Sequence, residues 1–271
     1  MVRHLVKIVE TMSFETYTEP FAGGAALLFA LPVRSGNSNY RKEAINDSNG
    51  LVANCYRVAR EQPVEFQRLL ELTPHSQEEH KRSLALCKAP TNNAMEMAWA
   101  FYVNINQSFA KTLNAGWSTS TGSENHAYTW HNLTSRLPES LGRLSGVSIG
   151  NEDALKFIDR WDSPKSLHYC DPPYPNTDQG HYKGYTVADY KNLVEKLDNI
   201  KGSFILSNYS QDVTHHESWS KLEIPVTSGA AKHVDGVDRS RTEVIWYHSN
   251  STQNNVQQSI ISYETKNGSF D

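Results

Sequence analysis

The stretch Asp171-Pro172-Pro173-Tyr174 contains the residues best suited to chemistry on a planar amine. It directly follows apolar and aromatic residues that end at Cys170, a pattern that predicts a buried strand. Proline has a fixed φ and no N–H group, so the backbone leaves the sheet here and its carbonyl groups are held in an extended geometry. A carboxylate and a carbonyl can accept the two N–H bonds of an amine while the tyrosine ring stacks on the attached ring. The alternative is a proline-rich loop that contains an acid by accident.

Two glycines and two acids follow other predicted strands. Gly23 and Gly24, in the stretch EPFAGG, allow the backbone to approach a ligand closely at the start of a helix, although such pairs commonly make only a tight turn. Asp47 ends the second predicted strand, where an acid can accept bonds from both hydroxyls of a ribose. The alternative there is a turn with a helix cap, for which Ser48 is the expected residue. Asp153 suits a hydrogen bond to an adenine amino group, or is only an acid in the first turn of a helix.

Strand and helix patterns alternate around these stretches. Strands are predicted at residues 16–21, 43–47, 146–150, 165–170, 203–209 and 241–250. Helices are predicted at residues 2–12, in AALLFAL, and at residues 48–61, 152–161 and 186–202. The last of them has a capping box of Thr186 and Asp189 and a stop at Gly202. This alternation predicts an α/β fold with a mostly parallel, doubly wound sheet, whose ligands bind beyond the carboxyl ends of the strands.

The middle of the chain interrupts this alternation. Helical patterns dominate there, and residues 109–125 form a polar segment rich in Gly, Ser and Thr. We therefore predict three parts: a discontinuous domain of residues 1–54 and 147–250, a helical insert of residues 55–146, and a polar tail of residues 251–271.

Composition excludes several classes of protein. A chain of 271 residues that is 38% hydrophobic can bury a sizeable core, and it contains no apolar run long enough for a membrane helix. Its three cysteines are far apart, which argues against a disulfide framework and for a reducing, cytoplasmic setting. No pair of histidines has the spacing of a metal site, and His215 and His216 would point apart on a helix, so we expect no metal. A net charge of −4 excludes nucleic-acid binding by bulk charge; a DNA-binding protein of this composition must gather its basic residues on one face.

The order EPFAGG, IND and DPPY, with a helical segment between the second and the third, resembles the alpha group of DNA adenine-N6 methyltransferases, the Dam-like family. The resemblance covers roughly residues 5–250. Residues 101–118, FYVNINQSFAKTLNAGWS, resemble the segment ahead of that family's DNA-reading loop, and RTEVIWY resembles its last core strand. The resemblance implies a Rossmann-like methyltransferase sheet, a helical target-recognition domain inserted at residues 55–146, and S-adenosylmethionine as the methyl donor without a metal.

The resemblance also implies roles for individual residues. The cofactor-binding residues would be Phe21, Ala22, Gly23, Gly24, Asp47, Asp153 and Asp171, and the catalytic residues Asp171, Pro172, Pro173 and Tyr174. The insert has nine Lys and Arg against eight Asp and Glu, so DNA contacts fall to single residues, namely Lys111, Asn114, Trp117, Arg136 and Arg143. The implied reaction is methyl transfer to N6 of an adenine flipped out of duplex DNA. We expect a monomer that binds DNA and no membrane, in a bacterial cell or encoded by a phage or prophage.

Three departures from the family pattern bear on the cofactor and the DNA. Ala154 stands where the family usually has Phe after the acid near the cofactor's adenine, and Ile105 stands where it has an arginine. No GGK-type motif precedes the helix at residues 2–12, so we expect modest cofactor affinity. Methylation of cytosine N4 or of RNA adenine, and a DNA-binding relative with weak catalysis, are the alternatives. Asp171 favours adenine, because cytosine enzymes more often have Ser at that position.

Overall fold

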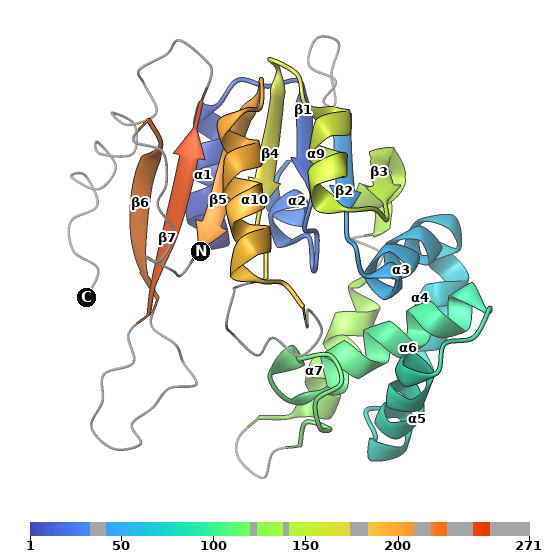
Figure 1. Ribbon diagram of the computed structural model, residues 1–271. Helices are drawn as coiled ribbons and strands as arrows, with labels where there is room; N and C mark the ends of the chain where they lie inside the picture. Colours follow the sequence, from blue (N-terminus) through green and yellow to red (C-terminus); the bar gives the residue numbers. More distant parts are fainter. Residues whose placement is uncertain are drawn as a thin grey trace, which may run out of the picture. The chain divides into compact units, whose positions relative to one another are not determined.

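The structure is a computed structural model that describes residues 1–32, 42–119, 124–137, 141–173, 184–208, 218–226 and 241–249 (Figure 1). Hydrogen bonding orders seven strands as β3-β2-β1-β4-β5-β7-β6. The strands are β1 (Thr16–Glu19), β2 (Lys42–Asn46), β3 (Val147–Gly150), β4 (Ser166–Cys170), β5 (Ser203–Asn208), β6 (Ser220–Val226) and β7 (Arg241–His248). Strands β1, β4 and β5 run parallel, and β7 runs antiparallel to β5. The predicted α/β class is confirmed.

The described α-helices are α1 (Val2–Thr11), α2 (Ala26–Ala30), α3 (Gly50–Glu61), α4 (Pro63–Glu71), α5 (Gln77–Lys88), α6 (Ala94–Gln107), α7 (His126–Ser135), α9 (Ala154–Trp161) and α10 (Val187–Asp198). The chain divides into two compact units. The first unit comprises Met1–Glu43, Leu155–Tyr174 and Val187–Asp271; the second comprises Ala44–Ala154 and Pro175–Thr186. The domain boundaries given above, with an insert at residues 55–146, stay a prediction.

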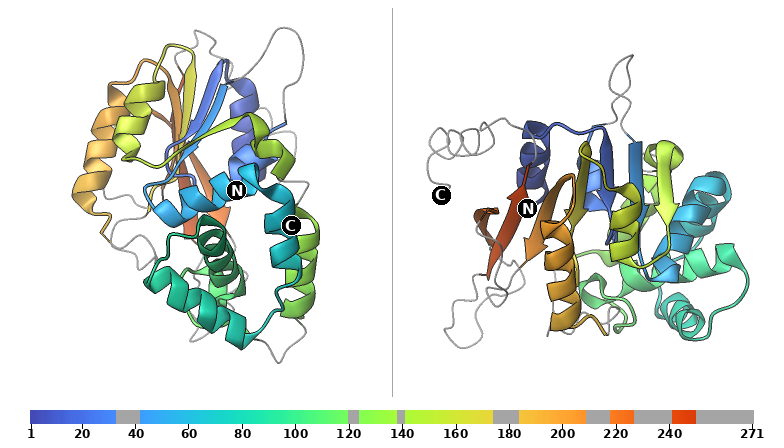
Figure 2. Two further views of the ribbon diagram at one scale, coloured as in Figure 1. Left: turned by 90° about the vertical axis from the view of Figure 1, so that its right-hand side faces the viewer. Right: turned by 45° about the horizontal axis from the view of Figure 1, so that its top comes forward.

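Strand β4 lies at the centre of the first unit. Thr16 of β1 pairs with Ser166, and Cys170 pairs with Leu206 of β5. All five residues of β4 are buried, as the run of apolar and aromatic residues predicts. Helices α10 and α1 cover opposite faces of the strands (Figure 2), as in a doubly wound fold.

Each of these two helices buries one side, which explains its place on the sheet. Helix α1 buries Leu5, Ile8 and Val9, whose spacing puts them on one face. Helix α10 buries an equivalent face formed by Tyr190, Leu193, Val194 and Leu197. The predicted amphipathic helices at both positions are therefore confirmed.

Strand β6 is not among the strands predicted from the sequence. It pairs antiparallel with β7, and Pro225 lies opposite Thr242 in that ladder. Proline lacks the N–H group of an interior ladder, so strands that contain it lie at sheet edges. β6 is indeed last in the strand order. An edge strand can contain a proline, and Pro225 made this strand difficult to predict from the sequence.

Two local predictions about helix ends are wrong. Asn49, and not Ser48, caps α3: its side chain accepts a hydrogen bond from the Leu51 N–H at 3.0 Å. Gly202 does not end α10, which stops at Asp198. A Cβ at Gly202 would lie 2.2 Å from Ser166 Oγ, so this glycine serves close backbone packing next to β4.

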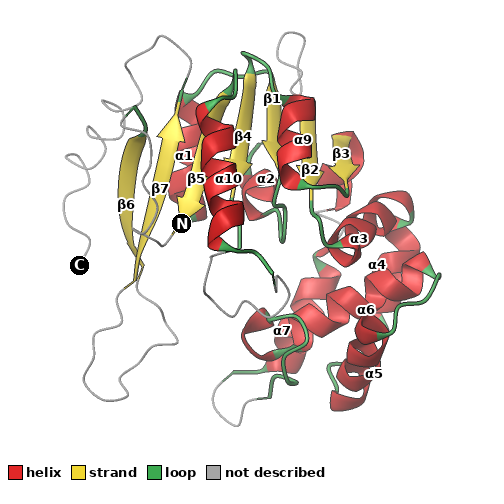
Figure 3. Cartoon of the chain, in the orientation of Figure 1, coloured by secondary structure: helices red, strands yellow, loops and turns green. Residues whose placement is uncertain are grey.

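The second unit contains helices α3 to α7 (Figure 3). Helix α6 packs against α3 and α5, and its segment from Met97 to Phe101 is buried throughout. Two indole N–H groups converge on one residue: Trp99 donates to the Thr73 hydroxyl at 2.8 Å, and Trp130 of α7 donates to the Thr73 carbonyl at 2.6 Å. Thr73 follows α4, so these bonds fasten the end of α4 to α6 and α7.

Two further features of the described residues bear on membranes and metals. None of the helices in these residues is both long and apolar enough to cross a membrane. Over the same residues, His, Cys, Asp and Glu side chains do not gather in groups of three or more that could hold a metal ion. The expectation that no metal takes part stays a prediction.

Candidate functional site

In the first unit, the loops after β1 and β4 leave the sheet at the same edge. Parallel pairing of Thr18 with His168 brings the carboxyl ends of these two strands together. The residues after β1 are 20–25, and those after β4 begin at Asp171. Ligands of doubly wound sheets bind at this edge. The topology therefore places the EPFAGG and DPP stretches on one side of the first unit.

The residues after β4 pass abruptly from a buried strand to an exposed acid. Cys170 is fully buried, Asp171 is exposed, and Pro172 and Pro173 are buried again. Burial raises the pKa of the Cys170 thiol, and the neighbouring Asp171 charge raises it further, so the thiol stays neutral. Asp171 is therefore accessible to solvent, whereas the two prolines are packed into the protein. Tyr174 lies outside the described residues.

Glu19, at the end of β1, is a buried acid that sequence reasoning did not assign to the site. Its side chain is 1% exposed. One carboxylate oxygen, Oε1, accepts hydrogen bonds from the Tyr17 hydroxyl at 2.8 Å and from the Leu28 N–H at 2.6 Å. Leu28 lies in the first turn of α2, whose N–H groups have no partner within the helix. Glu19 therefore fixes the start of α2 against the end of β1.

The glycine loop between β1 and α2 adopts a left-handed backbone at two positions. Gly23 has φ 47° and Ala25 has φ 46°, and the Ala25 N–H donates to the Ala22 carbonyl at 2.6 Å. Ala22 is buried, Phe21 is half-buried and Gly24 is exposed. A Cβ on Gly24 would meet no atom within 4 Å, so the backbone borders open space. A ligand can approach the main chain there, which fits the predicted cofactor loop.

In the second unit, Asp47 is buried directly after β2. Its Oδ1 accepts a hydrogen bond from the Asn49 N–H at 2.8 Å, and its carbonyl accepts one from Asn151 Nδ2 at 2.7 Å. The first bond is that of a turn, so the turn alternative is realised for Oδ1. The bond from Asn151 ties this turn to the residues after β3.

A second asparagine strengthens the same connection. Asn46 Nδ2 donates to the Glu152 carbonyl at 3.0 Å, and the Glu152 N–H donates to Asn46 Oδ1 at 2.9 Å. Asp153 comes next, exposed and directly before α9. Asn46 and Asn151 thus set the backbone on both sides of the predicted cofactor acids. The asparagines in IND and GNED are the sequence signal that could have identified them.

Three of the five predicted DNA-contacting residues share one loop of the second unit. Lys111 and Asn114 are exposed, and Trp117 is half-buried. The loop is closed by a bridge between Ser108 and Trp117. The Asn114 N–H donates to Oδ1 of the fully buried Asn104 at 2.7 Å. The structure therefore brings these three residues together on a braced loop.

The remaining two predicted DNA-contacting residues lie elsewhere in the second unit. Arg136 is exposed just after the end of α7. Arg143 is half-buried in the short 3-10 helix η2 (Gly142–Gly146). Both belong to different elements from the loop, and their roles stay predictions.

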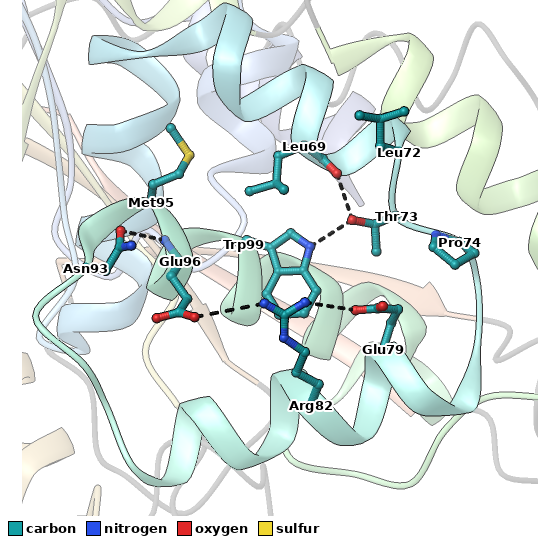
Figure 4. Close-up of a pocket in the computed structure, with 10 residues that line it drawn as sticks. All are labelled: Leu69, Leu72, Thr73, Pro74, Glu79, Arg82, Asn93, Met95, Glu96 and Trp99. Atoms are coloured by element: carbon teal, nitrogen blue, oxygen red, sulfur yellow. Dashed lines mark hydrogen bonds and ion pairs between the residues drawn. The ribbon is translucent and has the colours of Figure 1, made fainter.

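A cavity of about 390 Å3 lies between α4, α5 and α6, and none of the predicted site residues lines it (Figure 4). The guanidinium of Arg82 lies over the Trp99 ring, 4.6 Å from its centroid. It is 3.7 Å from a Glu79 oxygen and 4.0 Å from a Glu96 oxygen. A cation therefore already covers the ring face and opposes both acids, and these contacts link α5 to α6.

Comparison with known proteins supplies the family. The model of D12 class N6 adenine-specific DNA methyltransferases matches residues 1–228. No curated protein matches the chain. Among solved structures, the chain is similar to the rRNA methyltransferase aviRa from Streptomyces viridochromogenes, with 12% identity and a TM-score of 0.37 over 96% of this chain and 87% of that one.

Proposed function

Since the chain belongs to the D12 class of N6 adenine-specific DNA methyltransferases, we propose that it transfers the methyl group of S-adenosylmethionine to N6 of an adenine flipped out of duplex DNA. The observation that carries this proposal is the family match, which includes the stretch Asp171-Pro172-Pro173 at the end of the buried strand β4. The same match favours adenine in DNA over cytosine and over RNA.

Asp171 and the Pro172 carbonyl would each accept one N6–H bond of the target adenine. The lone pair of this nitrogen is delocalised into the ring, which makes the amine a poor nucleophile. Two acceptors draw the nitrogen towards tetrahedral geometry and localise the lone pair. S-adenosylmethionine supplies an electrophilic methyl group on a sulfonium. As the N–C bond forms and the C–S bond breaks, N6 becomes cationic, the Asp171 carboxylate stabilises that charge, and N6 then releases one proton to solvent.

Cofactor-binding roles are proposed for residues within each unit separately. In the first unit, the open backbone at Gly24 and the left-handed Gly23 support a role for residues 21–24 at the methionine end of the cofactor. In the second unit, Asp47 would bind the ribose and Asp153 the adenine. Support for Asp47 comes from its burial at the end of β2, where such acids meet a ribose.

DNA would be held by the exposed basic and polar residues of the second unit. Base flipping is required, because N6 cannot be reached within a stacked duplex. Tyr174 would stack on the flipped base, an interaction worth about 1–3 kcal/mol in proteins that bind single strands. Lys111 and Asn114, both exposed on the loop closed by Trp117, would meet the DNA backbone, with Arg136 as a further contact.

The test is methyl transfer from radiolabelled S-adenosylmethionine to plasmid DNA by wild type, Asp171→Ala and Asp171→Asn. We expect both variants to lose about 100- to 1,000-fold in rate, because a charge-stabilising acceptor is removed. Asp198→Ala, which removes an exposed acid at the end of α10, is the matched control and should keep the wild-type rate. Circular dichroism checks the fold of each variant. A rate for Asp171→Ala above a tenth of wild type would contradict the role of Asp171.

A further inference from the structure

The ring of His75, between α4 and α5, lies among aromatic side chains from two other segments of the second unit. It is half-buried. Its centroid is 5.3 Å from the Trp117 ring at an interplanar angle of 35°, and 5.9 Å from the His126 ring at 17°. Trp117 closes the loop that carries Lys111 and Asn114, and His126 is the first residue of α7. His75 therefore joins the loop to α7.

The backbone on both sides of His75 is held by one buried side chain. The Ser76 N–H donates to Gln107 Oε1 at 3.2 Å, and Gln107 Nε2 donates to the Pro74 carbonyl at 3.1 Å. Gln107 is the last residue of α6 and is fully buried. Its own carbonyl accepts the Ser118 N–H at 2.8 Å. Gln107 thus sets His75 and the far end of the loop in one frame.

The loop held in this way has a backbone that needs external support. Ala110, Lys111 and Asn114 have φ values of 53°, 52° and 64°, a left-handed conformation that residues other than glycine rarely adopt. Such positions persist only where the surroundings fix them. The Phe109 N–H bond to the Gly116 carbonyl, at 2.8 Å, and the packing of Trp117 against His75 are among the contacts that do so.

The groups around His75 favour its neutral form, so the aromatic stack with Trp117 and His126 is most stable when His75 is uncharged. Burial lowers the pKa of His75 and the nearby His126 lowers it further; a backbone hydrogen bond acts in the opposite direction and His80 again lowers it, so the net shift is downward. His80 has its own pKa lowered by burial, and its Nε2 lies 2.9 Å from Ser108 Oγ. A carboxylate oxygen of Glu124 is 3.7 Å from His126 Nε2, so the acid faces the outer imidazole of the pair. A proton on His75 would place a half-buried charge beside a second imidazole.

We propose that His75 is a positioning residue for DNA binding: in its neutral form it holds Trp117 and the loop of Phe109 to Gly116 in place, and its protonation releases them. This inference rests on the proposed function, which assigns the loop to DNA. Protonation of His75 is thus expected to weaken DNA binding. This is opposite to the general trend, because adding positive charge near DNA normally strengthens binding. Release is expected as the pH falls below about 6.5, the ordinary pKa of histidine.

The experiment measures the DNA dissociation constant by fluorescence anisotropy from pH 5 to pH 8 at constant ionic strength. For wild type we expect binding to weaken about two- to twelve-fold below pH 6, the range of one lost aromatic contact. His75→Phe keeps a ring in the stack without a titratable group, so its affinity should not weaken towards low pH. His75→Ala should bind weakly at every pH. His131→Phe, at an exposed position of α7, is the control and should follow wild type.

A second measurement separates this inference from the proposed function. The Trp117 indole N–H signal, followed by NMR without DNA, should shift as His75 titrates and should stay constant in His75→Phe. If that shift occurs but no DNA binds at any pH, the proposed function fails, whereas the role of His75 in holding Trp117 remains supported. If the signal is unmoved and His75→Phe has the wild-type pH profile of DNA binding, the inference is overturned.

Discussion

Replacing Glu19 should destabilise the first unit more than replacing an ordinary acid, because its carboxylate serves two buried donors. The Tyr17 hydroxyl and the Leu28 N–H both donate to Oε1, and both of these residues are 0% exposed. In Glu19→Ala, each donor loses this acceptor in a place that water does not reach. An unsatisfied buried group costs about 1–3 kcal/mol, so the two together cost about 2–6 kcal/mol.

The arrangement also predicts how a second substitution changes this loss. Tyr17→Phe removes one of the two donors, so it should cost less in the Glu19→Ala background than in wild type. A hydrogen bond to a charged group is worth about 1.5–3 kcal/mol, and the coupling in a double-mutant cycle should fall in that range. Burial, followed by Glu19, raises the pKa of Tyr17 well above its ordinary value near 10. The stability from neutral Tyr17 is therefore complete below pH 10 and is lost as the pH rises further.

Urea denaturation followed by circular dichroism measures the free energy of unfolding of wild type, both single variants and the double variant. Repeating it between pH 9 and pH 11 tests the alkaline loss, which Tyr17→Phe should reduce. A Glu19→Ala variant within 1 kcal/mol of wild type, or a coupling below about 0.5 kcal/mol, the error of additive sites, would refute the reasoning.

Three further predictions concern single residues. Asp47→Asn keeps an acceptor for the Asn49 N–H but loses the charge, so calorimetry should show S-adenosylmethionine binding about 10- to 150-fold weaker with little change in kcat. An unchanged dissociation constant would mean that Asp47 only forms the turn. Burial raises the pKa of Asp162, but hydrogen bonds outweigh this and lower the pKa to about 2. The urea midpoint of wild type should therefore fall between pH 4 and pH 2 and that of Asp162→Asn should change less; equal slopes would contradict this role of Asp162. Gly202→Ala forces a Cβ to 2.2 Å from Ser166 Oγ and should cost about 1–3 kcal/mol; an unchanged Tm would contradict the packing role.

The elements with a strong repeating pattern could be predicted from the sequence. Strand β4 is an uninterrupted run of buried residues, and α10 repeats apolar residues at helical spacing. Their order along the chain then leads to an α/β sheet with ligands at the carboxyl ends of the strands. The predictions of these elements and of the α/β sheet depend only on neighbours in sequence, which is why they hold; the ligand site stays a prediction.

The errors arose where contacts between distant segments decide the structure. Gly202 follows a helix, as a stop signal would, yet its role is to let the backbone pass close to Ser166. Asn49 caps α3 although Ser48 is an equally good capping residue by type, because the turn made by Asp47 sets where the helix begins. Strand β6 depends on its pairing with β7 more than on its own composition.

The candidate site divides in the same way. The DPPY stretch could be identified from residue types alone, because an acid and two prolines after an apolar strand are an unusual combination. Glu19 could not, since only the packing of α2 against β1 reveals that its carboxylate is buried with two donors. The asparagines in IND and GNED can be noticed in the sequence, but their bonds join segments about a hundred residues apart, so only the fold reveals their partners.

The proposed activity of this protein is methylation of N6 of adenine in DNA. The most direct measurement is to incubate the protein with unmethylated plasmid and S-adenosylmethionine carrying a deuterated methyl group, digest the DNA to nucleosides, and identify the labelled product by mass spectrometry. We predict deuterium-labelled N6-methyldeoxyadenosine from wild type, and about 100- to 1,000-fold less of it from Asp171→Ala in the same time. Label in N4-methylcytosine, or no label in any nucleoside from a folded protein that binds both substrates, would contradict the account.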